Sequence, residues 1–171
     1  MHELAVTAIG ADRPGIVAAV ARVLHERGGN LEDSAMTILG GHFAIVLLVA
    51  TEDGPEELRE ALTTATAELG LTISVSTADS ERRAADPTHL LSVYGADKPG
   101  IVAGVTSALA EVGANIVDLE TQVIGADTDP VYAMAIELET DAPAEVTAAV
   151  ERACAELGVD HMLRAIAAET Y

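Results

Sequence analysis

A short segment occurs twice in the chain, and this repeat constrains the fold more than any other feature. Residues 10–18 read Gly-Ala-Asp-Arg-Pro-Gly-Ile-Val-Ala, and residues 95–103 read Gly-Ala-Asp-Lys-Pro-Gly-Ile-Val-Ala. Each copy is followed at the same distance by Gly-x-Asn, which ends at Asn30 and at Asn115. Matching positions continue beyond both asparagines, interrupted by a short insertion in the second copy. The chain is therefore a tandem duplication of one structural unit.

The repeat divides the 171 residues into two domains, which we place at 1–76 and 89–171. Residues 77–88 show little hydrophobic periodicity and contain charged residues and a proline, so they are expected to form an exposed linker. The chain is 50% apolar and 22% charged, which excludes a disordered protein because enough apolar surface exists to offset the entropy of ordering.

The charge balance excludes some classes of partner. Twenty-eight acidic and nine basic residues give a formal net charge of −19, which repels nucleic-acid phosphates and anionic membranes and suits a basic partner protein. The longest wholly apolar run, Phe43 to Ala50, is far shorter than the roughly 20 residues of a membrane span. One cysteine and no leader segment predict a cytoplasmic location.

Hydrophobic periodicity and turn residues predict the same six elements in each copy. In the first copy a strand covers Glu3–Ile9, a helix begins after Asp12 and ends at Gly28, strands Asn30–Leu39 and Phe43–Ala50 form a hairpin through Gly40-Gly41, a second helix runs from Pro55 to Gly70, and a last strand covers Leu71–Ser76.

The order βαββαβ predicts an α+β fold. Two right-handed crossovers with a hairpin between them give a four-stranded antiparallel sheet with both helices on one face. The sequence therefore predicts two ferredoxin-like domains in tandem.

The repeated segment is also a candidate binding site. If Asp12 is the N-cap, Pro14 falls in the first turn, where proline is tolerated. Gly15 has no Cβ, so an anion such as a carboxylate can approach the amides of Gly15, Ile16 and Val17, and the Asp12 carboxylate can accept from an ammonium group. Asp-x-Pro-Gly is equally a common helix start without a ligand. The second copy repeats the pattern at Asp97, Pro99, Gly100 and Ile101.

Asn30 and Asn115 are the second group of candidates. Each amide side chain offers a donor and an acceptor to a zwitterion. Asparagine also tolerates the left-handed conformation that follows a helix, so backbone geometry alone is an alternative explanation for both.

These residues resemble the ACT domain, an amino-acid-sensing module whose signature is Asp-or-Asn-x-Pro-Gly after the first strand and Asn-Ile after the first helix. Here the second motif is Asn30-Leu31 in one copy and Asn115-Ile116 in the other. The resemblance covers both copies, and the tandem arrangement is similar to that of the glycine cleavage system transcriptional repressor group.

The resemblance implies that ACT units pair edge to edge through their second strands, within one chain or between two. A small amino acid then binds where the first loop of one unit faces that strand of the other, so that Asp12 faces Asn115 and Asp97 faces Asn30. The copies differ in the loop containing Asp127 and Asp129, which we expect to be solvated, so two equivalent sites are not implied. The implied ligand-binding residues are Asp12, Pro14, Gly15, Ile16, Asn30, Leu31, Asp97, Pro99, Gly100, Ile101, Asn115 and Ile116.

No other motif carries chemistry. The five histidines show no metal-ligand spacing, Cys154 lies on an apolar helix stripe, and no nucleophile, phosphate-loop or dinucleotide motif occurs. We therefore expect no metal, cofactor or catalytic residue. The sequence predicts a regulatory protein that senses a small amino acid, glycine or serine, and modulates a partner protein, in transcriptional regulation without direct DNA contact. The alternatives are a ligand-independent scaffold, a regulatory subunit of a metabolic enzyme, or a small enzyme that uses the ferredoxin-like sheet as a platform.

Overall fold

A computed structural model describes residues 1–78, 85–125 and 130–166. The chain divides into two compact units, Met1–Arg83 and Ala84–Tyr171, and each is described by itself. Asp127 and Asp129 of the predicted insertion loop lie outside the described residues. None of the described helices is both long enough and apolar enough to cross a membrane.

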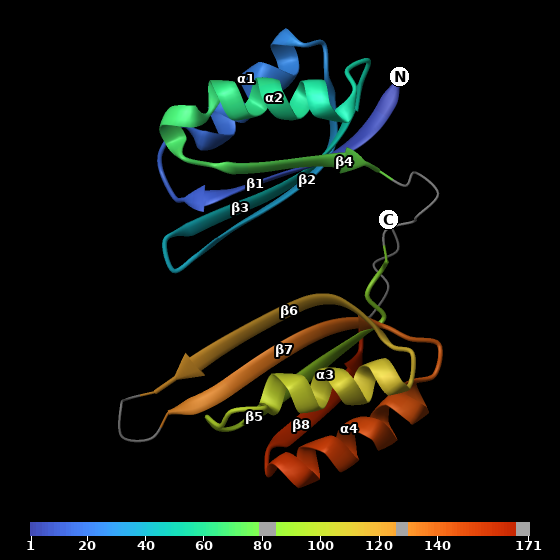
Figure 1. Ribbon diagram of the computed structural model, residues 1–171. Coiled ribbons are helices and arrows are strands. Elements are labelled where there is room, and N and C mark those ends of the chain that lie inside the picture. Colours follow the sequence, from blue (N-terminus) through green and yellow to red (C-terminus); the bar gives the residue numbers. More distant parts are fainter. Residues whose placement is uncertain (79–84, 126–129, 167–171) are drawn as a thin grey trace. The chain divides into compact units, whose positions relative to one another are not determined.

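The first unit is a four-stranded sheet with two helices on one side (Figure 1). The strand order is β2-β3-β1-β4, and every neighbouring pair is antiparallel. In chain order the elements are β1 (His2–Ala11), α1 (Ile16–Glu26), β2 (Asn30–Leu39), β3 (His42–Thr51), α2 (Pro55–Ala65), the single 3₁₀ turn η1 (Ala67–Leu69) and β4 (Thr72–Thr77).

The second unit repeats this architecture, with strand order β6-β7-β5-β8 and antiparallel pairing throughout. The elements of the second unit are β5 (His89–Ala96), α3 (Ile101–Glu111), β6 (Asn115–Ile124), β7 (Val131–Glu139), α4 (Pro143–Leu157) and β8 (Asp160–Ala165). The predicted α+β class and the two ferredoxin-like domains are confirmed.

Each unit has its own core, between the sheet and its helices. In β1 the buried residues Leu4, Val6 and Ala8 alternate with less buried ones, so one face of the strand points toward α1 and α2. Leu24 of α1 and Leu62 of α2 close this core from the helical side. Among the described residues, no helix of the same unit covers the other face of each sheet (Figure 1).

The end of α1 is fixed by a glycine motif. The Gly28 amide donates to the carbonyl of His25 at 3.0 Å, and the Gly29 amide donates to the carbonyl of Leu24 at 2.8 Å. With Gly28 at a φ of 70°, this is a Schellman ending, in which the left-handed residue is glycine. The motif sets the point at which the chain enters β2.

The second helices of the two units differ in length, since α2 stops at Ala65 whereas α4 runs to Leu157. The Thr66 hydroxyl, directly after α2, donates to the carbonyl of Leu62 at 2.8 Å. Cys154 occupies the matching place in α4, where a thiol is only a weak donor. The same kind of bond from Thr106 to Val102 lies inside α3 without ending it, so this bond alone does not set the helix length.

Cys154 belongs to the core of the second unit and is 1% exposed. The predicted role as a small buried side chain is confirmed. Burial raises the pKa of its thiol, because a thiolate in apolar surroundings loses its hydration.

We therefore expect Cys154 to be unreactive in the folded protein. Both its burial and its raised pKa lower the fraction of accessible thiolate, so labelling by a thiol reagent near neutral pH should follow unfolding of the second unit. Labelling rates in buffer and in denaturant check this, with free cysteine as the reference. Native labelling at the rate of free cysteine would contradict it.

Candidate functional site

The first helix of each unit begins later than the sequence suggested. Gly15, at φ 93°, is the N-cap of α1, and its carbonyl accepts from the Ala19 amide at 2.9 Å. No side chain caps this helix. The prediction that Asp12 is the N-cap was therefore wrong: a left-handed glycine, which no other residue type adopts without strain, makes the turn into the helix.

Asp12 instead joins the loop to the neighbouring hairpin. Its amide donates to the carbonyl of Gly41 at 2.9 Å, directly after the last residue of β1. Its side chain is exposed and is not used for capping. The carboxylate is therefore available on the same loop that carries the free amides of the helix start.

Conformation, rather than space, requires glycine at position 15. A Cβ placed on Gly15 would meet no atom within 4 Å, so the loop is open to solvent there. The amides of Gly15, Ile16, Val17 and Ala18 have no acceptor within the helix, and the helix dipole makes this end attractive to an anion. The Ile16 side chain is buried in the core, so only its backbone amide can serve a ligand.

The second loop has the same geometry and one additional contact. Gly100, at φ 97°, is the N-cap of α3, and its carbonyl accepts from the Gly104 amide at 2.8 Å. The Lys98 Nζ lies 3.7 Å from the place that a Cβ on Gly158 would take, directly after α4. An ammonium group at the negative end of α4 is electrostatically favourable.

The two asparagines are not explained by helix-end geometry. The left-handed residues after α1 and α3 are Gly28 and Gly113, and in the described part of the chain only glycines have positive φ. Asn30 is the first residue of β2, opposite Ala50, and Asn115 is the first residue of β6, opposite Glu139. Both are exposed at an edge strand, so the alternative based on a left-handed conformation is wrong.

Within one unit the loop and the asparagine lie at opposite ends of the sheet. Ala50, the partner of Asn30, also pairs with Glu3 at the start of β1, whereas Asp12 follows Ala11 at its end. Eight residues of strand separate the two, about 26 Å at roughly 3.3 Å per residue. The structure therefore does not bring Asp12 and Asn30 of the same unit together, and the same holds for Asp97 and Asn115.

Both edge strands carry an irregularity directly after the asparagine. The pairing of β2 with β3 shifts between Leu31 and Asp33, and that of β6 with β7 shifts between Ile116 and Asp118. A bulge of this kind twists an edge and redirects side chains. Leu31 is exposed, whereas Ile116 packs against its core, so the two predicted sites differ next to the asparagine.

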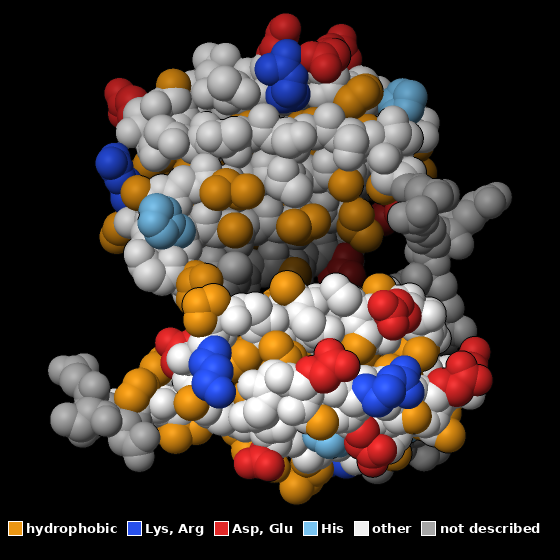
Figure 2. Space-filling view, turned by 60° about the horizontal axis from the view of Figure 1, so that its bottom comes forward, with side chains coloured by type: hydrophobic (Ala, Val, Ile, Leu, Met, Phe, Trp, Pro, Cys, Tyr) orange, Lys and Arg blue, Asp and Glu red, His pale blue; other side chains and the backbone are white. Residues whose placement is uncertain are grey.

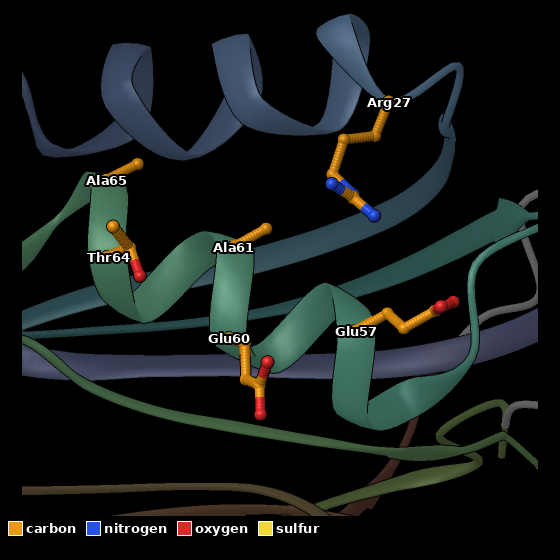
Figure 3. A pocket seen from close by; sticks show the side chains of 6 residues that line it. All are labelled: Arg27, Glu57, Glu60, Ala61, Thr64 and Ala65. Carbon is orange, nitrogen blue, oxygen red and sulfur yellow. The ribbon is translucent and has the colours of Figure 1, made fainter.

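A shallow groove of about 430 Å³ lies elsewhere, between α1 and α2 (Figure 3). Arg27 points into it from the end of α1 and forms an ion pair with Asp53; the hydrogen bond to Asp53 raises the pKa of Arg27. None of the predicted ligand-binding residues lines it. Its lining residues are Arg27, Glu57, Glu60, Ala61, Thr64 and Ala65.

Comparison with known proteins identifies the family. The family model of the ACT domain matches residues 2–76 and 88–163, one match in each unit. The chain belongs to the ACT domain family. It is 30% identical to the glycine cleavage system transcriptional repressor of Escherichia coli strain K12 over 96% of this chain and 90% of the relative.

Two solved structures are similar to this chain along nearly its whole length. An unknown protein from Galdieria sulphuraria is 35% identical, with a TM-score of 0.82 over 96% of this chain and 98% of its own. A putative glycine cleavage system transcriptional repressor is 23% identical, with a TM-score of 0.73 over 96% of this chain and 97% of its own, and supports the fold. Among the described residues, no group of three or more histidine, cysteine or acidic side chains could hold a metal ion.

The loop geometry of these ACT units predicts a specific effect of alanine substitutions. Gly15→Ala forces a Cβ into a left-handed backbone and should lower the free energy of unfolding by about 1–2 kcal/mol, although it causes no clash. Gly54→Ala is the matched control: Gly54, the N-cap of α2, has a φ of −73°, which alanine adopts freely, so this variant should lose only the small preference of an N-cap for glycine over alanine and be destabilised less than Gly15→Ala. Chemical denaturation of both variants checks this, and equal losses would contradict it.

Proposed function

We propose that this ACT protein is a regulator that binds a small amino acid, glycine or serine, and thereby changes its association with a partner protein. The observation that carries the proposal is the duplicated loop, in which an exposed aspartate lies beside the unpaired amides of a helix N-terminus. A relative similar along nearly the whole chain is a glycine cleavage system transcriptional repressor, which supports a regulatory role and a ligand of this size.

The loop chemistry matches the two charged ends of an amino acid. The ligand carboxylate accepts from the free amides at the start of α1 or α3, where backbone groups supply charge without a basic side chain. The ammonium group donates to the carboxylate of Asp12 or Asp97. Pro14 and Pro99 hold the loop in shape, and the ligand's own side chain is left to residues outside the loop.

The asparagines join this site only when two units pair. If the exposed edges of β2 and β6 pair antiparallel, the start of β2 lies beside the end of β6. Ile124 at the end of β6 pairs with Val131, and Val131 also pairs with Ala96, the residue before Asp97. The end of β6 and the Asp97 loop are therefore at the same end of the second sheet. Such pairing brings Asn30 toward the Asp97 loop, and Asn115 toward the Asp12 loop, within one chain or between two. Leu31 and Ile116 then lie beside the ligand.

Edge pairing also has a reason independent of any ligand. Met36 and Ile38 of β2 are exposed apolar side chains on a strand with unpaired backbone groups, and such edges are normally covered. A ligand between two units stabilises the paired state only if it binds that state more tightly than the separate units. The site is thus suited to convert ligand binding into a change of association.

Charge directs the proposal toward a protein partner. With a net charge of −19, close approach to DNA is opposed, so an effect on transcription would pass through another protein. The predicted cytoplasmic location remains a prediction.

Thermal unfolding against a panel of the common amino acids tests ligand binding. A ligand that binds only the folded state stabilises it by roughly 2.7 kcal/mol at a hundred times its dissociation constant, so one small amino acid should raise the unfolding temperature in a concentration-dependent way. A flat panel would contradict the proposal and favour a ligand-independent scaffold.

Substitution of the asparagines tests where the ligand binds. Asn30→Ala and Asn115→Ala should each weaken the ligand response about tenfold or more, since a buried polar contact is lost, while the unfolding temperature without ligand stays near that of the wild type. Thr63→Ala, at an exposed polar position on α2 outside the predicted ligand-binding residues, is the control. Unchanged ligand response in both asparagine variants would place the ligand elsewhere.

A further inference from the structure

The helix-free face of the first sheet is almost without charge. Directly paired residues of neighbouring antiparallel strands point to the same side, so the register identifies the residues opposite the buried core. The middle of this face, which we call the neutral patch, consists of Thr7, Ile9, Ala35, Ala44, Val46 and Ser74.

Acidic residues on this face lie only at one end of the sheet. Glu3 pairs with Ala50 and Asp33 pairs with Leu48, both outside the neutral patch. Figure 2 shows this face on the upper body, where hydrophobic side chains lie among backbone atoms and charged side chains are at the margins. Ile9 is 53% exposed and Val46 is 48% exposed. For a chain that is 22% charged, a neutral area across four strands is unusual.

The corresponding face of the second sheet is different. Glu120 of β6, Glu137 of β7 and Arg164 of β8 occupy positions on its helix-free side, as their pairing with Ala135 and Leu90 indicates. Against an uncharged surface these groups would lose water without gaining partners, which costs free energy. A surface like the second sheet is therefore a poor occupant for the neutral patch.

We propose that the neutral patch is a self-association surface, on which the first unit of a second copy of this chain packs sheet against sheet. Two copies with a charge of −19 each repel one another, and contact through this face avoids placing acidic groups opposite each other. The patch matches itself, because a two-fold axis near Val46 sets uncharged side chains against uncharged side chains. Sheets pack face to face at about 10 Å, a spacing that side chains of this size fill.

The area sets the strength of the contact. With its uncharged neighbours on the same face (Ala5, Thr37, Leu48, Thr72 and Ser76), the neutral patch covers four strands about 4.8 Å apart over about six residues, which gives roughly 400 Å² per copy, or about 800 Å² in total. This lies below the range of permanent dimers and within that of weak, reversible ones. The proposed association is therefore concentration-dependent, and it is separate from edge pairing because it uses the face of the sheet and not the backbone edge of β2.

Sedimentation velocity of the full chain over a concentration series tests the proposal. Val46→Lys places two ammonium groups together at the two-fold axis and should raise the dissociation constant of the association at least tenfold; Ile9→Lys should act in the same direction. Lysine lowers the net negative charge, so greater overall repulsion cannot explain a loss. Met162→Lys on β8 is the matched control, because Met162 is 56% exposed on the helix-free face of the second sheet and should leave association unchanged.

Circular dichroism and thermal unfolding of the same variants show whether they fold. The proposal is overturned if the wild type does not self-associate, if Val46→Lys associates as the wild type does, or if Met162→Lys weakens association equally. A Val46→Lys variant that unfolds at a lower temperature without a change in mass overturns it too, since the patch would then be covered within the chain. Retained ligand binding in a dissociated Val46→Lys variant separates this surface from the proposed amino-acid site.

Discussion

The structure depends on the one-sided burial of each sheet by its two helices. Because strand residues alternate between faces, Leu4, Val6 and Ala8 meet the helices while their neighbours face away, and this pattern recurs with Leu91 and Val93 in the second unit. The proposed ligand site and the proposed association surface use what this arrangement leaves uncovered: the loops that lead into α1 and α3, the edges β2 and β6, and the helix-free face of the first sheet. A helix on the other side of each sheet would bury the helix-free face and leave the loops and the edge strands exposed.

Much of this architecture could be predicted from the sequence, because it depends on local patterns that occur twice. Periodicity located the strands and helices, and the glycines at 28 and 40 marked real chain reversals. The start of α1 was missed for a physical reason. Asp12 is a residue type that commonly forms an N-cap. The sequence Asp-x-Pro-Gly does not distinguish a cap at the aspartate from a left-handed cap at Gly15, since either one leads into the same helix.

The candidate site could be predicted only as a set of residues, because its members lie far apart in each unit. Sequence spacing places Asn30 soon after Asp12, yet β1, α1 and the register of β2 carry them to opposite ends of one sheet. A difference between the copies was equally hidden: Thr66 and Cys154 occupy matching positions, but the hydroxyl of Thr66 donates to the carbonyl of Leu62, whereas Cys154 is a buried core thiol. Such effects depend on atoms that a hydrophobicity pattern does not distinguish.

The separation of loop and asparagine within a unit gives the proposed site its regulatory character. A pocket complete in one unit would bind its ligand with the same affinity whether or not units pair, and would transmit nothing. A pocket assembled from two edges couples ligand binding to pairing by thermodynamic necessity, and the coupling acts in both directions, so whatever strengthens pairing also strengthens ligand binding.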